Sequence, residues 1–464
     1  MIYARRQQRS FADGLIAEEV SDLWEPWMLH VDEALKDDGL LTIIPKELSK
    51  RCQKSKTRGR PGTTAEVILR MLLLKHLRGW SYVEVTREVR ANLVYRQFTG
   101  IGGGKVPDDK TMGGLGRQLG PEVIEKLHQR VVAIALEKQV VTGRKMRVDT
   151  TVVETNIHYP TDSTLLNDGV RVLTRVMKKV MAVAGEAGTK LRDRTRSVKR
   201  HALDIARASR DKSEKGQAKM KAAYIKLLET TSRVVGQAKK FSREITDKVK
   251  QGPRTVLRKA KKQLEEMIPR VKQVMEQTRE RVIGGNTRAK KIFSVFEMET
   301  EIIRKGKASK PNEFGKMMKI QEAENQIVTH YEVFDERPSD SNLLTPSIEK
   351  HIEIFGRAPG LTTADSGFFS AANETKAKEL GVKRVSVPSR GTKSEKRKLE
   401  QKKRWFRDAQ RWRTGCEGRI SLLKRRHGLN RSLYKGINGM KRWVGLGVIA
   451  DNIINIGVHL SLKC

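Results

Sequence analysis

The chain has 464 residues, of which 38% are hydrophobic and 32% are charged. This composition allows two or three domains with hydrophobic cores, but it is too highly charged for one compact globule. The 94 Lys and Arg residues outnumber the 54 Asp and Glu residues, which gives a formal net charge of +40. Nucleic acid is the commonest partner of so positive a field, and a membrane surface is the second. The chain lacks the basic amphipathic helix with a bulky aromatic face that would favour a membrane.

Residues 1–135 are predicted to form a helical N-terminal domain. Thr63 and Glu66 fit a capping box in front of an apolar helix that ends at Gly79, and Ser81 with Glu84 fits a second box. Two helices joined by a short turn are typical of a helix–turn–helix, but many unrelated helical pairs look the same. DNA binding or dimerisation by this domain and simple helix packing therefore both remain open.

Residues 145–160, with the sequence KMRVDTTVVETNIHYP, are predicted to form a short strand that ends just after Tyr159. Alternation places Met146, Val148, Thr150 and Val152 on one face and Arg147, Asp149, Thr151 and Val153 on the other. A carboxylate in the middle of a β-branched strand is unusual. Asp149 is either a solvated residue, as most charged residues are, or part of a functional site.

Residues 166–288 are predicted to form a long, basic helical insertion. Apolar residues recur at helical spacing, and between Arg171 and Lys290 the chain has 34 Lys and Arg residues against 12 Asp and Glu residues. Two to four long antiparallel helices would satisfy this pattern. They form either a solvated spacer or a surface for the phosphate backbone. We favour the second, because a spacer does not require so unequal a charge.

The α/β pattern returns after the insertion. Strands are predicted at 291–300, at 326–335, just before Asp365 and at 382–387, with helices at 346–355 and 370–381. The strand that carries Asp149 must pair with these strands, because a lone strand would leave its backbone groups without partners. We therefore predict an α/β domain with a mixed sheet, formed by residues 136–165 and 289–464.

Two further acidic residues lie in this domain. Asp365 ends an apolar strand, at the edge where ligands bind in such sheets, although an Asp at this place is often only a turn or cap residue. On a later helix, Glu417 lies about 40° and Lys424 about 20° from Arg413 on a helical wheel. These three residues form one charged stripe, which is either an ordinary exposed ion pair or a functional surface.

Two glycines lie on the opposite side of the same helix. Gly415 and Gly418 each weaken a helix by about 1 kcal/mol relative to alanine. A helix that is merely solvated has no reason to carry them, so we predict a packed helix with another element close to these glycines.

Three carboxylates that point toward one another would repel one another and have raised pKa values. Divalent cations relieve such repulsion. Carboxylate oxygens suit Mg²⁺ or Mn²⁺, and no His/Cys set competes for the role. Two such ions can activate a water or a 3′-hydroxyl and stabilise the leaving oxygen of a phosphodiester.

The most apolar stretch of the chain is Trp443–Leu462. Asp451, Asn452 and Asn455 interrupt it, which would be costly in lipid. The first residues, MIYARRQQRSFADG, have no apolar core of signal-peptide length, and three widely spaced cysteines fit no zinc pattern. We predict a buried helix here and a cytoplasmic protein.

Together the stretches VDTTVVETNIHYPTDSTLL and TTADSGFFS and the spacing Arg413-x₃-Glu417-x₆-Lys424 resemble the DDE transposases of bacterial insertion sequences. More narrowly, they resemble the branch whose last motif reads Tyr-x₂-Arg-x₃-Glu-x₆-Lys. The stretch GRPGTTAEVILRMLLLKHLRGWSYVEVTREV resembles the helical domain ahead of the catalytic core in that group. The resemblance extends from about residue 10 to residue 460.

The resemblance implies an RNase H-like fold with Asp149 on the first strand, Asp365 after the fourth and Glu417 on a late helix, these three holding two Mg²⁺ or Mn²⁺ ions. It implies endonuclease cleavage at the element's ends and attack of the freed 3′-hydroxyl on target DNA. The residues expected to contact DNA are Arg413, Lys424, Trp412 and Arg419. The expected partners are double-stranded DNA, with its terminal inverted repeats and target, and a second copy of the chain, in the bacterial cytoplasm near the nucleoid.

Two features depart from the family pattern. The tyrosine position of the last motif is Gln410, so Trp405, Phe406 or Trp412 would have to supply any stacking. The helical insertion follows the first strand, whereas better-known relatives often carry it after the second aspartate. Two alternatives remain: a decayed or non-catalytic basic DNA-binding protein, and a nuclease of the same fold without strand transfer.

Overall fold

A computed structural model describes residues 3–6, 11–20, 22–51, 62–184, 190–248, 254–285, 291–304, 311–391 and 394–462. The chain divides into two compact units. Met1–Asn156 and Ile303–Cys464 form the first, and Ile157–Ile302 form the second. The second unit begins before and ends after the insertion predicted at 166–288.

Eight helices precede the first strand in the part of the chain that is described. They are α1 (Phe11–Glu19), α2 (Pro26–Leu35), α3 (Asp38–Leu48), α4 (Ala65–Arg78), α5 (Tyr82–Ala91), α6 (Leu93–Phe98), α7 (Asp109–Gln118) and α8 (Pro121–Glu137). The predicted capping box of Ser81 and Glu84 is confirmed, and Gly79 ends α4 with a left-handed backbone. The N-cap of α4 is Thr64, not Thr63, because the Thr64 hydroxyl accepts the backbone N–H of Val67.

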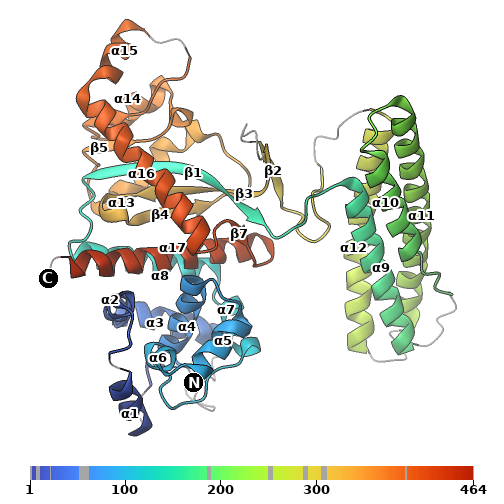
Figure 1. Ribbon diagram of the computed structural model, residues 1–464, viewed down its shortest axis with the longest axis horizontal. Helices are drawn as coiled ribbons and strands as arrows, with labels where there is room; N and C mark the ends of the chain where they lie inside the picture. Colours follow the sequence, from blue (N-terminus) through green and yellow to red (C-terminus); the bar gives the residue numbers. More distant parts are fainter. Residues whose placement is uncertain are drawn as a thin grey trace. The chain divides into compact units, whose positions relative to one another are not determined.

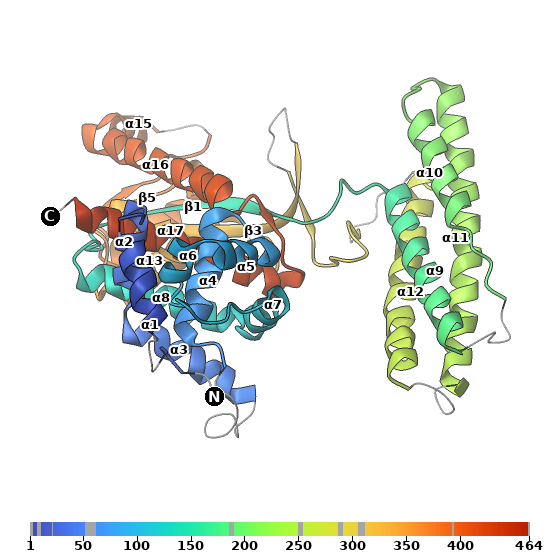
Figure 2. The same ribbon diagram turned by 60° about the horizontal axis from the view of Figure 1, so that its bottom comes forward.

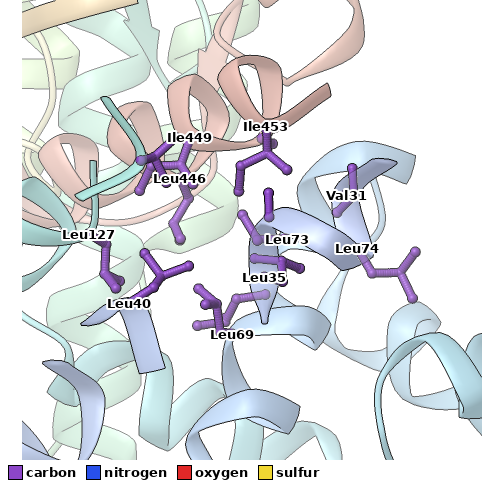
Figure 3. Packing of buried hydrophobic residues seen from close by; sticks show 14 of the residues in the cluster. Val31, Leu35, Leu40, Leu69, Leu73, Leu74, Leu127, Leu446, Ile449 and Ile453 are labelled. Atoms are coloured by element: carbon purple, nitrogen blue, oxygen red, sulfur yellow. The ribbon is translucent and has the colours of Figure 1, made fainter. Parts of the chain in front are cut away.

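The last helix, α17 (Gly436–Ser461), has the length and hydropathy of a membrane span, but most of it is buried in the protein. Leu446, Ile449 and Ile453 of α17 pack with side chains from α2, α3, α4 and α8 in one hydrophobic core. Figure 3 shows these side chains pointing toward one another. The helix predicted at Trp443–Leu462 is therefore a core helix, which joins the end of the chain to its N-terminal helices.

Within the described residues the sheet has seven strands, β1 (Lys145–Thr155), β2 (Glu301–Arg304), β3 (Asn312–Glu322), β4 (Val328–Val333), β5 (Leu361–Thr363), β6 (Arg384–Ser386) and β7 (Arg431–Ser432). Its main order is β2-β3-β1-β5-β6, while β4 also pairs with β3 and β7 with β1. β1 is antiparallel to β3 and parallel to β5, so the predicted mixed sheet is confirmed.

Helices cover both faces of this sheet (Figure 1). Met146, Val148 and Val152 of β1 pack with α13 (Leu344–Phe355) and α14 (Ala371–Glu379). Val153 lies on the opposite face with α16 (Arg404–Arg426) and α17. This alternation is the one predicted for β1, and it places the Asp149 face under α16. A short helix, α15 (Glu395–Lys402), precedes α16.

The prediction of a strand at 291–300 is wrong. Ile292 and Val295 of this stretch belong to the core of the second unit, and the Ser294 hydroxyl accepts the backbone N–H groups of Phe296 and Glu297 in a turn. Apolar residues three apart fit a turn as well as an imperfect alternation. The long strand β3 was not predicted, because its buried residues include Lys316, Lys319 and other polar side chains that hide the apolar pattern.

The second unit is a bundle of four long helices that lie side by side (Figure 2). They are α9 (Asp162–Ala184), α10 (Thr195–Ala208), α11 (Glu214–Lys248) and α12 (Arg254–Val282). Aliphatic residues fill its core, and Tyr224 and Phe241 are the aromatic residues buried there among those described. The prediction of two to four long helices is confirmed.

Four buried charged residues connect the sheet to its two C-terminal helices. Arg147 of β1 donates from Nε to Glu322 of β3 at 3.0 Å. Arg419 of α16 lies 4.0 Å from Glu322 and donates to both carboxylate oxygens of Asp451, on α17, at 2.8 and 3.1 Å. Each of the four side chains is at most 6% exposed. We call Arg147, Glu322, Arg419 and Asp451 the buried ion network.

This network gives a first prediction. Arg419→Met removes one cation and leaves Asp451 buried without its main partner, so the free energy of unfolding should fall by about 3–5 kcal/mol. Urea denaturation of the full chain measures this loss. The matched control is Arg411→Met on the same helix, whose ion pair with Asp408 is exposed and should contribute less than about 1 kcal/mol. Equal losses in both variants would contradict the importance of the network.

Candidate active site

Asp149 lies on the face of β1 that α16 covers. Its Oδ1 accepts the backbone N–H of Thr150 at 2.7 Å, and its side chain is 14% exposed. Burial raises the pKa of Asp149 to about 6; the nearby charges of Asp365 and Glu417 also raise it, whereas Arg413 lowers it. The Asp149 carboxylate is therefore destabilised by its surroundings, which marks it as a candidate functional residue.

Asp365 lies beside Asp149 because of the strand register. Arg147 of β1 is paired with Thr363, the last residue of the parallel strand β5, so Asp149 lies two residues beyond this pair on β1 and Asp365 two residues beyond the end of β5. The Asp365 carboxylate accepts the backbone N–H of Gly367 at 2.8 Å, which fixes it at the start of a short 3₁₀ turn (Ser366–Phe368). The two aspartates thus meet at one edge of the sheet.

Glu417 reaches the same place from α16, which contacts both β1 and β5. Arg413, one turn earlier, donates from Nη2 to Glu417 Oε1 at 3.0 Å. Its Nη1 lies 3.8 Å from Asp149 Oδ2. The charged stripe predicted on this helix therefore faces the aspartates, with the Arg413 guanidinium between Asp149 and Glu417. Lys424 is half-buried two turns beyond Glu417.

The donor chemistry of this cluster fits a hard divalent cation. Asp149, Asp365 and Glu417 supply only carboxylate oxygens, which suit Mg²⁺ or Mn²⁺. In the described part of the chain, no three Asp, Glu, His or Cys side chains lie close enough together to share one ion. The carboxylates of Asp149 and Glu417 are kept apart by the Arg413 guanidinium, which occupies the space between them.

A fourth carboxylate, Asp340, was not predicted from the sequence. Its Oδ1 accepts the hydroxyl of Thr150 at 3.0 Å, and burial raises its pKa, with a further contribution from Asp365. A Cβ placed on Gly367 would lie 2.9 Å from Asp365 Oδ1 and 3.1 Å from Asp340 Oδ2. β4 runs parallel to β1 and β5, so the loop that follows β4 lies on the same side of the sheet as Asp365. The position of Asp340 in this loop was the feature of the sequence that could have indicated it.

The other residues predicted to contact DNA are placed differently. Arg419 is buried in the ion network, so its prediction as a DNA contact is wrong. Trp412 is half-buried, with its ring 4.8 Å from the guanidinium of Arg147, and its backbone carbonyl accepts from the same group. One face of the Trp412 ring is therefore already covered. Arg413 remains on the side of α16 that faces the carboxylates.

The two glycines of α16 have different surroundings. A Cβ at Gly415 would overlap Arg147 Nη1 and lie 3.1 Å from its Cζ, so the helix approaches β1 closely at this point. A Cβ at Gly418 would meet nothing within 4 Å. The close approach predicted from both glycines is thus present at Gly415 and absent at Gly418.

Two protein families match parts of the chain. A transposase domain (DUF772) matches residues 31–115, which lie in the N-terminal helices. A transposase DDE domain matches residues 373–456, from α14 to α17, a range that includes Arg413, Glu417 and Lys424 but neither Asp149 nor Asp365. No curated protein and no solved structure matches the chain.

The contrast between the glycines gives a second prediction. Gly415→Ala should lower the midpoint of thermal unfolding by several degrees, because the buried guanidinium of Arg147 is held by Glu322 and cannot move aside cheaply. Gly418→Ala should stabilise the helix by about 0.5–1 kcal/mol. Differential scanning calorimetry measures both. A stabilised Gly415→Ala variant would show that α16 is not in contact with β1 there.

The raised pKa of Asp149 gives a third prediction. The folded chain holds this proton up to a pKa of about 6, whereas the unfolded chain releases it near 3.8. Its charge therefore destabilises the fold above pH 6, and this cost disappears as the pH falls toward 4. Asp149→Asn should increase the free energy of unfolding by about 1–3 kcal/mol at pH 7.5 and by little at pH 4.

Urea denaturation in EDTA at several pH values would measure this difference. Asp193→Asn is a control of opposite sign, because hydrogen bonding and the charge of Lys178 lower the pKa of Asp193 to about 2. A gain for Asp149→Asn that does not change with pH would contradict the prediction.

Proposed function

We propose that this chain, which belongs to the DDE transposases of insertion sequences, cuts DNA at the two ends of its element and joins the freed 3′-hydroxyls to target DNA. One observation carries the proposal. Asp365 follows the end of β5, the parallel neighbour of β1, near enough for its charge to raise the pKa of Asp149, and Arg413 of α16 contacts Glu417 and lies near Asp149. Neither aspartate is inside the matched family ranges, so the sheet register supports their role independently.

Asp149, Asp365 and Glu417 would hold two divalent ions, Mg²⁺ or Mn²⁺. When bound, such ions make a water or a 3′-hydroxyl a better nucleophile and stabilise the oxygen that leaves the phosphorus. The burial of Asp149 favours this use, because a carboxylate with few water contacts interacts strongly with a nearby cation.

The chain's own cations would orient the DNA. The Arg413 guanidinium has donors in a planar fork, a geometry that matches a phosphate as well as a carboxylate. It pairs with Glu417 and lies near Asp149 in the absence of DNA, so it can transfer one of these contacts to a phosphate beside the reacting bond. Lys424 on the same stripe would contact a phosphate further along the strand.

Other parts of the protein fit the same activity. The mixed sheet with Asp149 on its long strand β1 supports an RNase H-like catalytic core. The bundle's surplus of Lys and Arg suits the phosphate backbone, and the N-terminal helices would recognise the inverted repeats. Two ends must be held together for joining, so the active form would be a homodimer in the cytoplasm.

A nuclease without strand transfer is the second candidate, and a protein that binds DNA without cutting it is the third. The carboxylate cluster disfavours the third, because acids with a purely structural role have no reason to gather where Asp365 and Glu417 raise the pKa of Asp149. The first two differ only in whether joined products form.

The test uses the purified full chain with a labelled duplex that carries an element end, identified from short inverted repeats in the DNA beside the coding region. Asp149→Asn, Asp365→Asn and Glu417→Gln should each slow Mg²⁺-dependent cleavage by ~10³-fold or more, since each removes a ligand for the ions. Binding of the duplex in EDTA should stay within about twofold of the unchanged protein, because the phosphate contacts come from cations elsewhere.

Lys402→Gln, on the neighbouring helix α15, is a control that should cut at the normal rate. Full cleavage by any of the three carboxylate variants would remove that residue from the site. Cleavage without joined products, with a supercoiled target present, would favour the nuclease.

A further inference from the structure

Gln410 occupies a place in the site that the motif assigns to a tyrosine. It lies on α16 one turn before Arg413 and is half-buried. Its side chain points at the ends of β5 and β6, the two strands that lead into the carboxylate edge of the sheet. The hydrogen bonds of the Gln410 carboxamide therefore indicate the role of a glutamine at this position.

The amide nitrogen of Gln410 is surrounded by acceptors. Nε2 lies 2.7 Å from the backbone carbonyl of Ser386, 3.0 Å from the hydroxyl of Ser386 and 3.0 Å from the hydroxyl of Thr363. The carbonyl of Ala364, which directly precedes Asp365, is 3.4 Å away. Thr363 and Ser386 are fully buried. Both N–H groups of the amide are thus used inside the protein, on the backbone that positions Asp365.

The amide oxygen of Gln410 is used as well. Arg413 donates from Nε to Gln410 Oε1 at 3.2 Å. The reversed amide would place an N–H against the Arg413 N–H and an oxygen against several other oxygens, so this orientation is the one the site allows. Arg413 is thereby held at Nε, while its two terminal nitrogens lie toward Asp149 and Glu417.

We propose that Gln410 is a positioning residue: it fixes the Arg413 guanidinium between Asp149 and Glu417 and ties α16 to the strand ends beside Asp365, without contacting DNA. This inference rests on the proposed transposase activity. A phenol at this position would be free to stack on a base or contact a phosphate. The carboxamide of Gln410 has no donor left for such a contact, because its bonds are internal.

The role through Arg413 has a measurable consequence for cation binding. Without the Gln410 contact, Arg413 is free to pair fully with both carboxylates, and a divalent cation must then displace it. Loss of the Gln410 amide should therefore weaken cation binding only while Arg413 is present. A general loosening of the sheet edge would weaken cation binding whether Arg413 is present or not.

The first experiment compares Gln410→Met with Gln401→Met in the full chain. Met keeps the length of the side chain and favours a helix. Gln401 on α15 is also half-buried and donates one hydrogen bond, to the Ser389 hydroxyl at 3.2 Å. Gln410→Met should slow single-turnover cleavage of the labelled element end by ~10–100-fold, because a small misplacement of catalytic groups is costly. Its affinity for the duplex in EDTA should stay within about twofold of the unchanged protein, because phosphate contacts dominate that affinity.

Gln401→Met should change neither quantity. Unchanged cleavage in Gln410→Met would overturn the inference, as would weaker duplex binding with an unchanged rate at saturating DNA, which is the result expected of a direct DNA contact. If the Met variant does not fold, Gln410→Asn serves instead, since it keeps an amide that is too short to reach both strands and Arg413.

The second experiment measures Mn²⁺ binding by calorimetry in the unchanged protein, Gln410→Met, Arg413→Met and the double variant. Gln410→Met should weaken Mn²⁺ binding by ~3-fold or more, within the range of coupled neighbours, and should have no effect when Arg413 is absent. Equal effects in both backgrounds would overturn the role through Arg413. A chain that binds no Mn²⁺ and cuts no DNA would instead refute the proposed function, so the two failures are distinguishable.

Discussion

The buried ion network is the constraint on which the site depends. Arg147 and Glu322 bind β1 to β3, and Arg419 and Asp451 bind α16 to α17, so four elements distant in sequence share one set of charges. Burying these charges is expensive, and a hydrophobic set of the same volume could be equally stable. The charges instead determine how the helices and strands are aligned with one another. Carboxylates and guanidinium groups pair in few geometries, whereas apolar side chains tolerate a helix that slides or turns.

This fixed register determines where the charged stripe of α16 lies. Gly415 permits the helix to approach Arg147 closely, and the same contact sets the rotation of α16 about its axis. With that rotation, Arg413 and Glu417 lie toward the edge where Asp149 and Asp365 meet. Gln410, one turn earlier, completes the alignment from the other side. The side of α16 that packs against Arg147 is thus next to the side that carries Arg413 and Glu417. A change in the packing of the first side therefore moves the side chains on the second.

The sequence was sufficient for the elements with strong local signals. Three patterns predicted the observed arrangement, because side-chain period follows from backbone geometry: the alternation around Asp149, the helical spacing of the bundle, and the shared side of Arg413 and Glu417 on α16. It was insufficient where long-range contacts decide. Arg419 carries the same charge as a DNA-binding arginine, and only its pairing with Asp451 shows that it is buried. Asp340 and Gln410 have roles that depend on strand direction and hydrogen bonding, which no spacing records.

The charges of this protein act at two distances. Its surplus of Lys and Arg makes a positive field that would attract a polyanion such as DNA over the Debye length, about 10 Å in moderate salt. At the carboxylate cluster, however, the field has the opposite sign, because Asp149, Asp340, Asp365 and Glu417 converge there. A phosphate would be repelled from such a cluster unless cations neutralise it. Arg413 lies between Asp149 and Glu417, where Gln410 holds it at Nε, and the charges of Arg337 and Arg390 act on Asp340, so basic side chains already offset part of this negative charge.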